Sequence, residues 1–312
     1  MSRMATEIPK DFVEPSGSGV SFGRPVGRIL TYAVLILWAF ICLFPLYWIA
    51  TTAFKDAKDI YAFKLIPWVQ FDPSWKGYQS LGLSPDTIRE ASTPREQLIK
   101  HYKNTVVISV SAALLTTVAG SLAAYGLSRF SYKFGPWRNK DISFWFLSQL
   151  ILPPIALVMP LLVLYRPQSL DLLDTRAGLI LVYIIMTLPI VIWIMRDQFN
   201  SIPQELEQAA LVDGAGIWQA FLRIVVPIAA PGFVAAFILA LVLCWNEYFF
   251  AVTFSGAKSP TLPILLAGQT GSQGTRWWSI SALATITIMP LVLIGIFLER
   301  YIIKGLTAGA VK

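Results

Sequence analysis

The sequence predicts an all-α membrane protein with six transmembrane helices, and three observations support this fold class. The chain of 312 residues is 55% hydrophobic and only 14% charged, with a mean hydropathy of +0.61, whereas a soluble domain carries more charge. The apolar residues gather in six runs, each near the ~20 residues that a helix needs to cross a bilayer. A polar, helix-prone island separates the fourth run from the fifth.

The six runs contain at most one acidic residue between them, so each is expected to form one transmembrane helix. The first run is longer than the ~7 to 15 apolar residues of a cleavable signal peptide and follows a polar leader, so we expect it to remain as an anchor. Prolines inside the runs are expected to kink them. The predicted spans are residues 29–50, 105–127, 142–165, 177–195, 228–254 and 280–298.

The leader, residues 1–27, is rich in Ser, Gly and Pro and has too few large apolar groups to offset the entropy of ordering. We therefore expect a flexible N-terminal tail followed by a transmembrane domain over residues 28–312. An even number of spans puts both termini on one side of the membrane. The short basic loop after the second span favours the cytoplasm for that side; its basic residues are Arg129, Lys133, Arg138 and Lys140.

The polar island, residues 200–231, reads as two short helices joined by an elbow. Ser201 and Gln204 have the spacing of a capping box around Pro203, which predicts a helix start. Gly214 tolerates the left-handed backbone that ends a helix, so the first helix should stop there. A second segment then has apolar residues at the spacing of one helix face: Ile217, Ala220, Phe221, Ile224 and Val225.

Two interpretations of the island remain open on composition alone. Ala209, Ala210 and Gly214 have little or no side chain, so the surface of another protein could approach the backbone closely. The alternative is an interfacial hairpin that lies on the lipid with no partner.

The island resembles the cytoplasmic coupling motif of ABC importer permeases, in which a Glu-Ala-Ala run is followed by Asp-Gly-Ala, an aromatic residue, Ile and Pro. Here the aromatic, Ile and Pro are Phe221, Ile224 and Pro227. One departure is Gln208, because an acidic residue usually precedes the Ala pair, and Glu205 and Glu207 lie nearby as substitutes. An exposed ion pair contributes only ~0.2 to 1 kcal/mol, so docking should depend on shape. The implied ATPase-coupling residues are Glu205, Glu207, Gln208, Ala209, Ala210, Asp213, Gly214 and Ala215.

The C-terminal tail, KGLTAGAVK, narrows the resemblance to carbohydrate importer permeases of the maltose-transporter type, over nearly the whole chain from about Arg28. In that family the tail reaches toward the nucleotide-binding subunits. By itself the tail also fits a juxtamembrane stop, in which glycines end the sixth span and Arg300 and Lys304 extend to the interface. The implied ATPase contacts are Gly305, Leu306, Thr307 and Gly309.

Four residues of the fifth run, Trp245, Asn246, Glu247 and Tyr248, are candidates for a sugar path. A carboxylate inside a span is expected to face the bundle interior or a water-filled cavity, and hydroxyl-binding groups beside aromatic faces suit a sugar. The alternative places Glu247 near the outer end, satisfied by water or a backbone amide, with Trp245 and Tyr248 as interfacial anchors. The residues favour this alternative slightly. The resemblance weakens the sugar path further, since in maltose-type systems the membrane sugar site can belong mainly to the partner permease.

The resemblance implies a type I ABC importer permease fold and a non-enzymatic subunit of a sugar importer in the bacterial inner membrane. Its implied partners are a second, different permease, two ATPase subunits and an external solute-binding protein. No Gly-rich phosphate loop ending in Lys and Ser or Thr is present in the sequence, so ATP and Mg²⁺ should be used by the partner subunits. His101 is the only histidine, which argues against a metal centre.

Other classes of protein are less well supported by the residues. The net charge of +7 comes from basic residues that flank the spans and do not form a nucleic-acid patch. An ion-coupled secondary transporter would need several buried ionisable residues, and only Glu247 is available. A membrane enzyme would need a nucleophile with a base, or a metal cluster, inside the spans. The cargo stays open among sugars and polyols.

Overall fold

The computed structural model describes residues 23–271 and 274–307. The chain divides into two units, residues 1–48 and residues 49–312. The first unit contains most of α1 (Gly23–Thr52), an apolar helix with Pro45 inside it. The tail expected over residues 1–27 lies outside the described residues as far as residue 22, and residues 23–27 already belong to α1.

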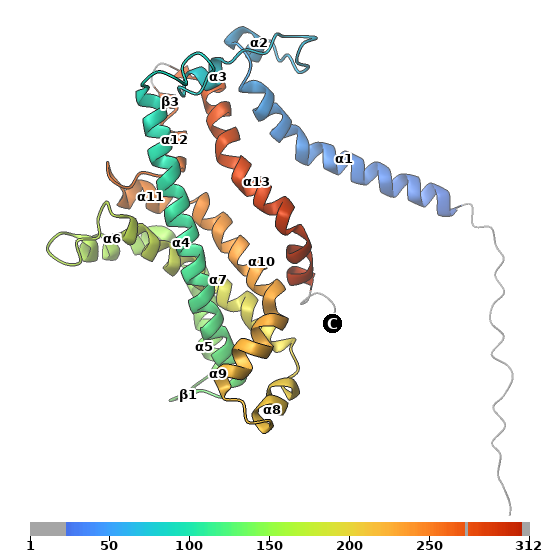
Figure 1. The fold of residues 1–312 in the computed structure, drawn as a ribbon, viewed down its shortest axis with the longest axis vertical. Coiled ribbons are helices and arrows are strands. Elements are labelled where there is room, and N and C mark those ends of the chain that lie inside the picture. Colours follow the sequence, from blue (N-terminus) through green and yellow to red (C-terminus); the bar gives the residue numbers. More distant parts are fainter. Residues whose placement is uncertain (1–22, 272–273, 308–312) are drawn as a thin grey trace, which may run out of the picture. The chain divides into compact units, whose positions relative to one another are not determined.

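The second unit is a bundle of four long helices with short elements at its two ends and α6 at its side (Figure 1). The long helices are α4 (Thr93–Arg129), α7 (Arg176–Asn200), α10 (Val226–Trp245) and α13 (Trp277–Thr307). The shorter helices are α2 (Ala57–Tyr61), α3 (Lys76–Gln79), α5 (Asn139–Ser148), η1 (Gln149–Ile151), α6 (Pro154–Tyr165), α8 (Glu205–Val212), α9 (Ile217–Ala220), the π-helical turn η2 (Phe221–Val225), α11 (Phe249–Phe254) and α12 (Leu262–Ala267). Two antiparallel hairpins pair β1 (Lys133–Phe134) with β2 (Trp137–Arg138) and β3 (Thr270–Gly271) with β4 (Gly274–Thr275).

Helix α4 packs along α7, and it also contacts α10. Its buried face consists largely of small residues, which let helix backbones approach closely. A Cβ at Gly120 would lie 2.7 Å from Cγ1 of Val191, so only glycine fits this crossing. The hydroxyls of Thr116 and Thr187 form a buried hydrogen bond of 3.1 Å between the two helices. Helices α4 and α7 are therefore closely packed along this crossing.

Within the described part of the chain, five helices are long and apolar enough to cross a membrane, and a sixth span exists if α5 and α6 are counted together. These two helices are bent by 94° relative to each other, so the expected continuous helix over residues 142–165 is interrupted. Leu152 is extended, with ψ of 124°, because the ring of Pro153 disfavours helical backbone in the preceding residue.

The expected span over residues 228–254 is also interrupted. Helix α10 ends at Trp245 and α11 starts at Phe249. The residues between them include Glu247, whose carboxylate accepts hydrogen bonds from backbone N–H groups at the start of α11. The acidic residue thus begins a new helix where the hydropathy pattern predicted a continuous one.

Candidate functional site

The candidate site is the junction between α8 and the end of α4, and α8 begins three residues later than the capping pattern predicted, with Gln204 in place of Ser201 as the capping residue. The expected capping box at Ser201 is wrong. Helix α7 continues to Asn200, so Ser201 lies at the end of that helix and its hydroxyl donates to the carbonyl of Gln198 at 2.7 Å. Helix α8 starts at Glu205 with Gln204 in the capping position.

The end of α8 agrees with the predicted elbow. Gly214 has φ of +90°, a conformation that favours glycine. Its N–H donates to the carbonyl of Leu211 at 3.1 Å, and the N–H of Ala215 donates to the carbonyl of Ala210 at 2.9 Å. These two bonds are the Schellman pattern that closes a helix end. The elbow therefore has a fixed shape, and no heavy atom lies within 4 Å of a Cβ built at Gly214.

Helix α8 presents an exposed surface made of small, polar and apolar residues. Glu205, Gln208 and Ala209 are exposed, whereas Ala210 and Ala215 are half-buried. The apolar residues Leu206 and Leu211 are also exposed, and Val212 is 88% exposed. These three residues were not among the predicted site residues, because they do not follow the three- and four-residue spacing of one helix face. An exposed apolar surface of this kind is typical of a contact with another protein.

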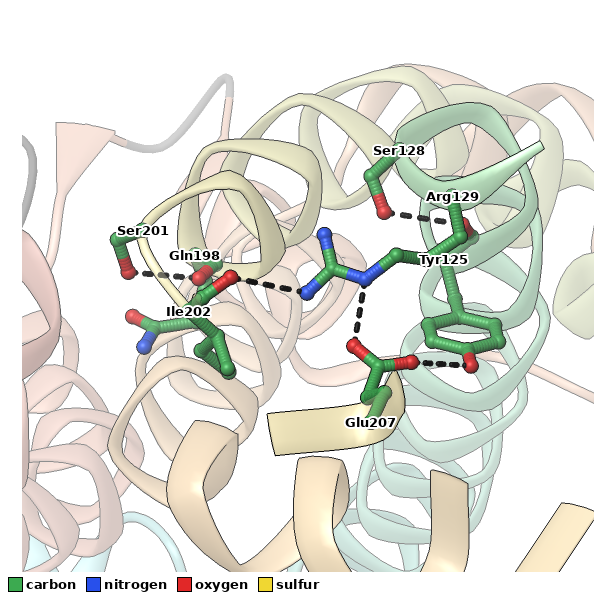
Figure 2. A network of polar contacts seen from close by, with 7 residues as sticks. All are labelled: Tyr125, Ser128, Arg129, Gln198, Ser201, Ile202 and Glu207. Atoms are coloured by element: carbon green, nitrogen blue, oxygen red, sulfur yellow. Dashed lines mark hydrogen bonds and ion pairs between the residues drawn. The ribbon is translucent and has the colours of Figure 1, made fainter. Parts of the chain in front are cut away.

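Glu207 is the exception on α8, because its side chain is buried and points toward α4 (Figure 2). Its Oε1 accepts from Nε of Arg129 at 2.5 Å, and its Oε2 accepts from the hydroxyl of Tyr125 at 2.7 Å. Arg129 also donates from Nη2 to the carbonyl of Ile202 at 3.1 Å. We call Tyr125, Arg129 and Glu207 the inner latch.

The inner latch gives an internal partner to two residues that the sequence had singled out for other reasons. Glu207 was expected to substitute for the acidic residue missing at position 208 in an ion pair with a docked protein. Its carboxylate is instead bonded to Arg129 and Tyr125 of this chain. Arg129 was a charge that indicated topology, yet it is the partner of Glu207 across 78 residues of sequence. Long-range pairing of this kind leaves no spacing pattern in one sequence, so it could not be predicted.

Burial makes the inner latch stronger than a surface pair. The side chains of Arg129 and Glu207 are 7% and 9% exposed, and removing one partner of such a pair costs about 3 to 5 kcal/mol. The ring of Tyr125 packs against Phe221 and Phe199, with centroids 4.5 Å and 5.6 Å away. Helix α8 is thereby tied to α4, to the segment after α7 and, through Phe221, to η2.

The four candidates for a sugar path have different environments. Trp245 is buried, and its Nε1 donates to the carbonyl of Thr287 at 3.1 Å, so it is not an interfacial anchor. Glu247 accepts from the N–H groups of Phe250 and Ala251, each at 3.0 Å, which is the backbone-amide alternative. The other two candidates, Asn246 and Tyr248, are exposed.

A second polar cluster, absent from the sequence predictions, lies at the other end of α4 and centres on Asp174. The carboxylate of Asp174 accepts from the N–H of Gly256 at 2.6 Å, the N–H of Lys258 at 3.0 Å and the N–H of Ser259 at 3.0 Å. The Ser259 hydroxyl adds a bond of 2.9 Å. Burial raises the pKa of Asp174, but these hydrogen bonds outweigh it and hold the pKa below its usual value.

The same cluster extends to α4 through Asn104. Its Nδ2 donates to the carbonyl of Pro260 at 2.9 Å, and its Oδ1 accepts from Nε of Arg176 at 2.9 Å. We call Asn104, Asp174, Arg176 and Ser259 the outer clamp. The outer clamp holds the loop between α11 and α12 against α4 at Asn104, and Asn104 is in turn bonded to Arg176 at the start of α7.

The C-terminal candidates are described only in part. Gly305, Leu306 and Thr307 belong to the last turns of α13, so the glycine does not end the sixth helix as the juxtamembrane alternative expected. Gly309 lies outside the described residues.

Comparisons with known proteins found relatives over nearly the whole chain. The chain is 32% identical over 290 residues to the inner membrane ABC transporter permease protein YcjP of Escherichia coli, covering 93% of this chain and 98% of the relative. It is 31% identical over 287 residues to the trehalose/maltose transport system permease protein MalG of Thermococcus litoralis, covering 91% and 97%. A bacterial ABC transporter that imports the polysaccharide alginate contains a chain of similar fold, with a TM-score of 0.67 and 19% identity over 90% of this chain and 98% of that one.

Residues 116–308 match the family described as binding-protein-dependent transport system inner membrane component. This range includes the inner latch, α8, the elbow and the outer clamp apart from Asn104. Members of this family are transport components, so the chain is a transport subunit and not an enzyme. The chain belongs to this family of inner-membrane permease components of binding-protein-dependent ABC importers.

Proposed function

We propose that this chain is one of two permease subunits of an ATP-driven sugar importer, and that α8 couples it to the ATPase subunits. The observation that carries the proposal is that α8 has both an exposed surface and one buried residue, Glu207, that binds α4. Ala209 and the apolar residues of α8 are exposed, while Glu207 is bonded to α4 through a buried ion pair. One helix thus has a surface for a partner and a rigid connection to the membrane spans.

Movement would pass from α8 to the spans through the inner latch. ATP binding would draw the two ATPase subunits together and displace the docked α8 as a rigid body. The Glu207–Arg129 pair would carry this displacement to α4, and the bond from Arg129 to Ile202 would carry it to the end of α7. Because α4 packs closely on α7 and α10, the helices would move together and alternate access to the pathway.

The proposed assembly contains a second, different permease, two ATPase subunits and an external solute-binding protein. ATP and Mg²⁺ would be bound by the ATPase subunits. Both termini would be cytoplasmic, with residues 1–27 as a tail and residues 28–312 as the transmembrane domain. The basic loop that follows α4 supports this orientation, because it lies at the end of α4 that is joined to α8. We retain Gly305, Leu306, Thr307 and Gly309 as proposed ATPase contacts.

A sugar is the proposed cargo, and the relative from Thermococcus litoralis, which is a trehalose/maltose system component, supports it. Of the four candidates for the path, Asn246 and Tyr248 are the exposed ones and offer an amide, a hydroxyl and an aromatic face. Trp245 and Glu247 would shape the break between α10 and α11 that presents them. The family assignment decides against the ion-coupled secondary transporter.

Replacement of Gly214 tests the docking role of α8. Gly214→Glu places a bulky anion on the exposed elbow, and we expect it to abolish ATP-dependent uptake while membrane insertion stays normal. Uptake of labelled maltose and trehalose into proteoliposomes containing the complete transporter is the measurement. Gly214→Asn is the matched control, since Asn tolerates positive φ better than most residues, and it should keep more uptake than the Glu variant.

Two outcomes would count against the proposal. Normal uptake by Gly214→Glu would remove the docking role of the elbow. Uptake by this chain alone in liposomes, driven by an ion gradient without an ATPase, would remove the coupling function altogether.

A further inference from the structure

The loop between α4 and α5 surrounds a surface cavity with three basic side chains. The cavity has a volume of about 650 Å³ and includes Lys133, Arg138 and Lys140 in its wall. All three side chains are exposed. The pairing of β1 with β2 places Lys133 directly opposite Arg138, so the hairpin brings together charges that are separated in sequence. The remaining lining residues are Ser131, Tyr132, Asn139 and Asp141.

The positive charge of this cavity is not neutralised within the described part of the chain. None of the three basic residues forms an ion pair there. The one carboxylate in the wall, Asp141, accepts a hydrogen bond of 2.8 Å from the backbone N–H of Arg138 and so serves to start α5. Three positive charges against one negative charge favour an anionic ligand.

A second cavity adjoins the first and is mainly apolar and aromatic. It has a volume of about 450 Å³, and Asp141 lies in the wall of both. Three large exposed side chains in its wall are Trp137, Phe144 and Trp145. Tryptophan is enriched where a membrane meets water. A ligand that occupies both cavities must therefore carry a negative head and an apolar body.

The position of the loop suits a membrane ligand. Asn139 anchors it to the end of α4 by donating from Nδ2 to the carbonyls of Leu127 and Phe130 at 2.8 Å and 2.6 Å. The same end of α4 carries the inner latch. The two cavities thus lie where α4 ends and α5 begins, beside the apolar run that includes α5.

We propose that this pair of cavities binds an anionic phospholipid. The phosphate of the headgroup would lie among Lys133, Arg138 and Lys140, and an acyl chain would lie along Trp137, Phe144 and Trp145. Basic pockets beside transmembrane helices on the cytoplasmic side are suited to anionic headgroups. The adjoining apolar cavity favours a lipid over a soluble phosphate, which would leave it in water.

Photolabelling of the complete transporter in nanodiscs tests the proposal. The probe is a photoreactive phosphatidylglycerol in a background of phosphatidylcholine, with labelled peptides mapped by mass spectrometry. We expect labelling within residues 131–148, and we expect a variant that combines Lys133→Gln, Arg138→Gln and Lys140→Gln to lose about tenfold or more of it. The charge-preserving variant Lys133→Arg with Lys140→Arg should keep the labelling.

A matched control separates this cluster from a general effect of charge. Lys58→Gln, Arg89→Gln and Lys103→Gln remove three exposed basic residues elsewhere, and together they should leave labelling of residues 131–148 unchanged. Co-purification of the ATPase subunits with each variant shows that the permease is folded and assembled.

Three results would overturn the proposal. They are equal labelling of the assembled triple variant and the unchanged protein, equal labelling by a photoreactive phosphatidylcholine, and loss of labelling when inorganic phosphate is added at constant ionic strength. The last result would assign the basic cavity to a soluble anion. None of these results depends on ATP-driven uptake, so the coupling function and the lipid site are tested separately.

Discussion

The two ends of α4 are fastened in different ways. At the inner latch, a buried ion pair joins Arg129 to Glu207, and each partner comes from a different helix. At the outer clamp, the carboxylate of Asp174 accepts several backbone N–H groups of a single loop. The first connection depends on two charged side chains, whereas the second is distributed over a loop backbone.

This difference suggests different mechanical roles for the two ends. A buried pair is favourable only while both charges stay together, so α8 and the end of α4 are expected to move as one body. The outer clamp consists of several individually modest hydrogen bonds, so it holds the shape of the loop and can lose them one at a time. The following predictions test this contrast, beginning with the largest expected effect.

Breaking the inner latch should lower the free energy of unfolding more than breaking the outer clamp. Arg129→Met or Glu207→Met alone leaves a buried charge without its partner and is expected to lower the free energy of unfolding by about 3 to 5 kcal/mol. The double variant should be less destabilised than the sum of the two, because no unpaired charge remains. Thermal unfolding of the purified transporter completes the double-mutant cycle, and uptake should fall in all three variants.

The matched control for this cycle is Arg223→Met. Arg223 is an exposed arginine on η2, near the latch in sequence order but outside it, and its replacement should change stability by no more than about 0.5 kcal/mol. Additive effects of the two latch variants would show that Arg129 and Glu207 are not coupled.

Breaking the outer clamp should have a smaller and local effect. Asp174 has φ of +54°, so Asp174→Asn is preferred to Ala because Asn tolerates this backbone. The variant loses the charge and part of the hydrogen bonding, with an expected cost of ~1 to 3 kcal/mol. Hydrogen exchange should become faster over residues 255–262 and stay unchanged over α8. Faster exchange at α8 would contradict the independence of the two ends.

The smallest effect concerns pH. Because hydrogen bonds hold the pKa of Asp174 below its usual value of ~3.9, its stabilising contribution is complete above that pH and is lost as the pH falls through the lower, folded pKa. The difference in unfolding temperature between the unchanged protein and Asp174→Asn should therefore be constant near neutral pH and shrink in acid. A difference that increases toward acid would show that the pKa is raised and not lowered.

Part of the candidate site was predictable because its signals are local. The elbow at Gly214 follows from the need for a left-handed residue at a helix end, and the position of α8 follows from the polar residues between two apolar runs. The start of α8 was misplaced because Ser201 serves α7, and a capping residue fits either of two adjacent helices in sequence.

Other parts could not be predicted because they depend on distant contacts. The break at Pro153 had a local signal, but the 94° bend depends on how α5 and α6 pack. Glu247 was correctly identified as unusual, yet its partners at the start of α11 exist only because the helix is interrupted there. Asp174 had no distinguishing pattern at all, since its partners lie more than 80 residues away.

The sequence by itself determined the membrane class, the apolar runs, the polar helical segment between the fourth and fifth runs and its glycine elbow. These features depend on hydropathy over one helix length and on the backbone preference of single residues, both of which are local properties. Only the tertiary structure decided that Glu207 faces Arg129, that Asp174 holds the loop between α11 and α12, and that basic and aromatic cavities adjoin after α4. The physical reason is that charges and hydrogen-bond donors choose partners by distance in space, which one sequence does not record.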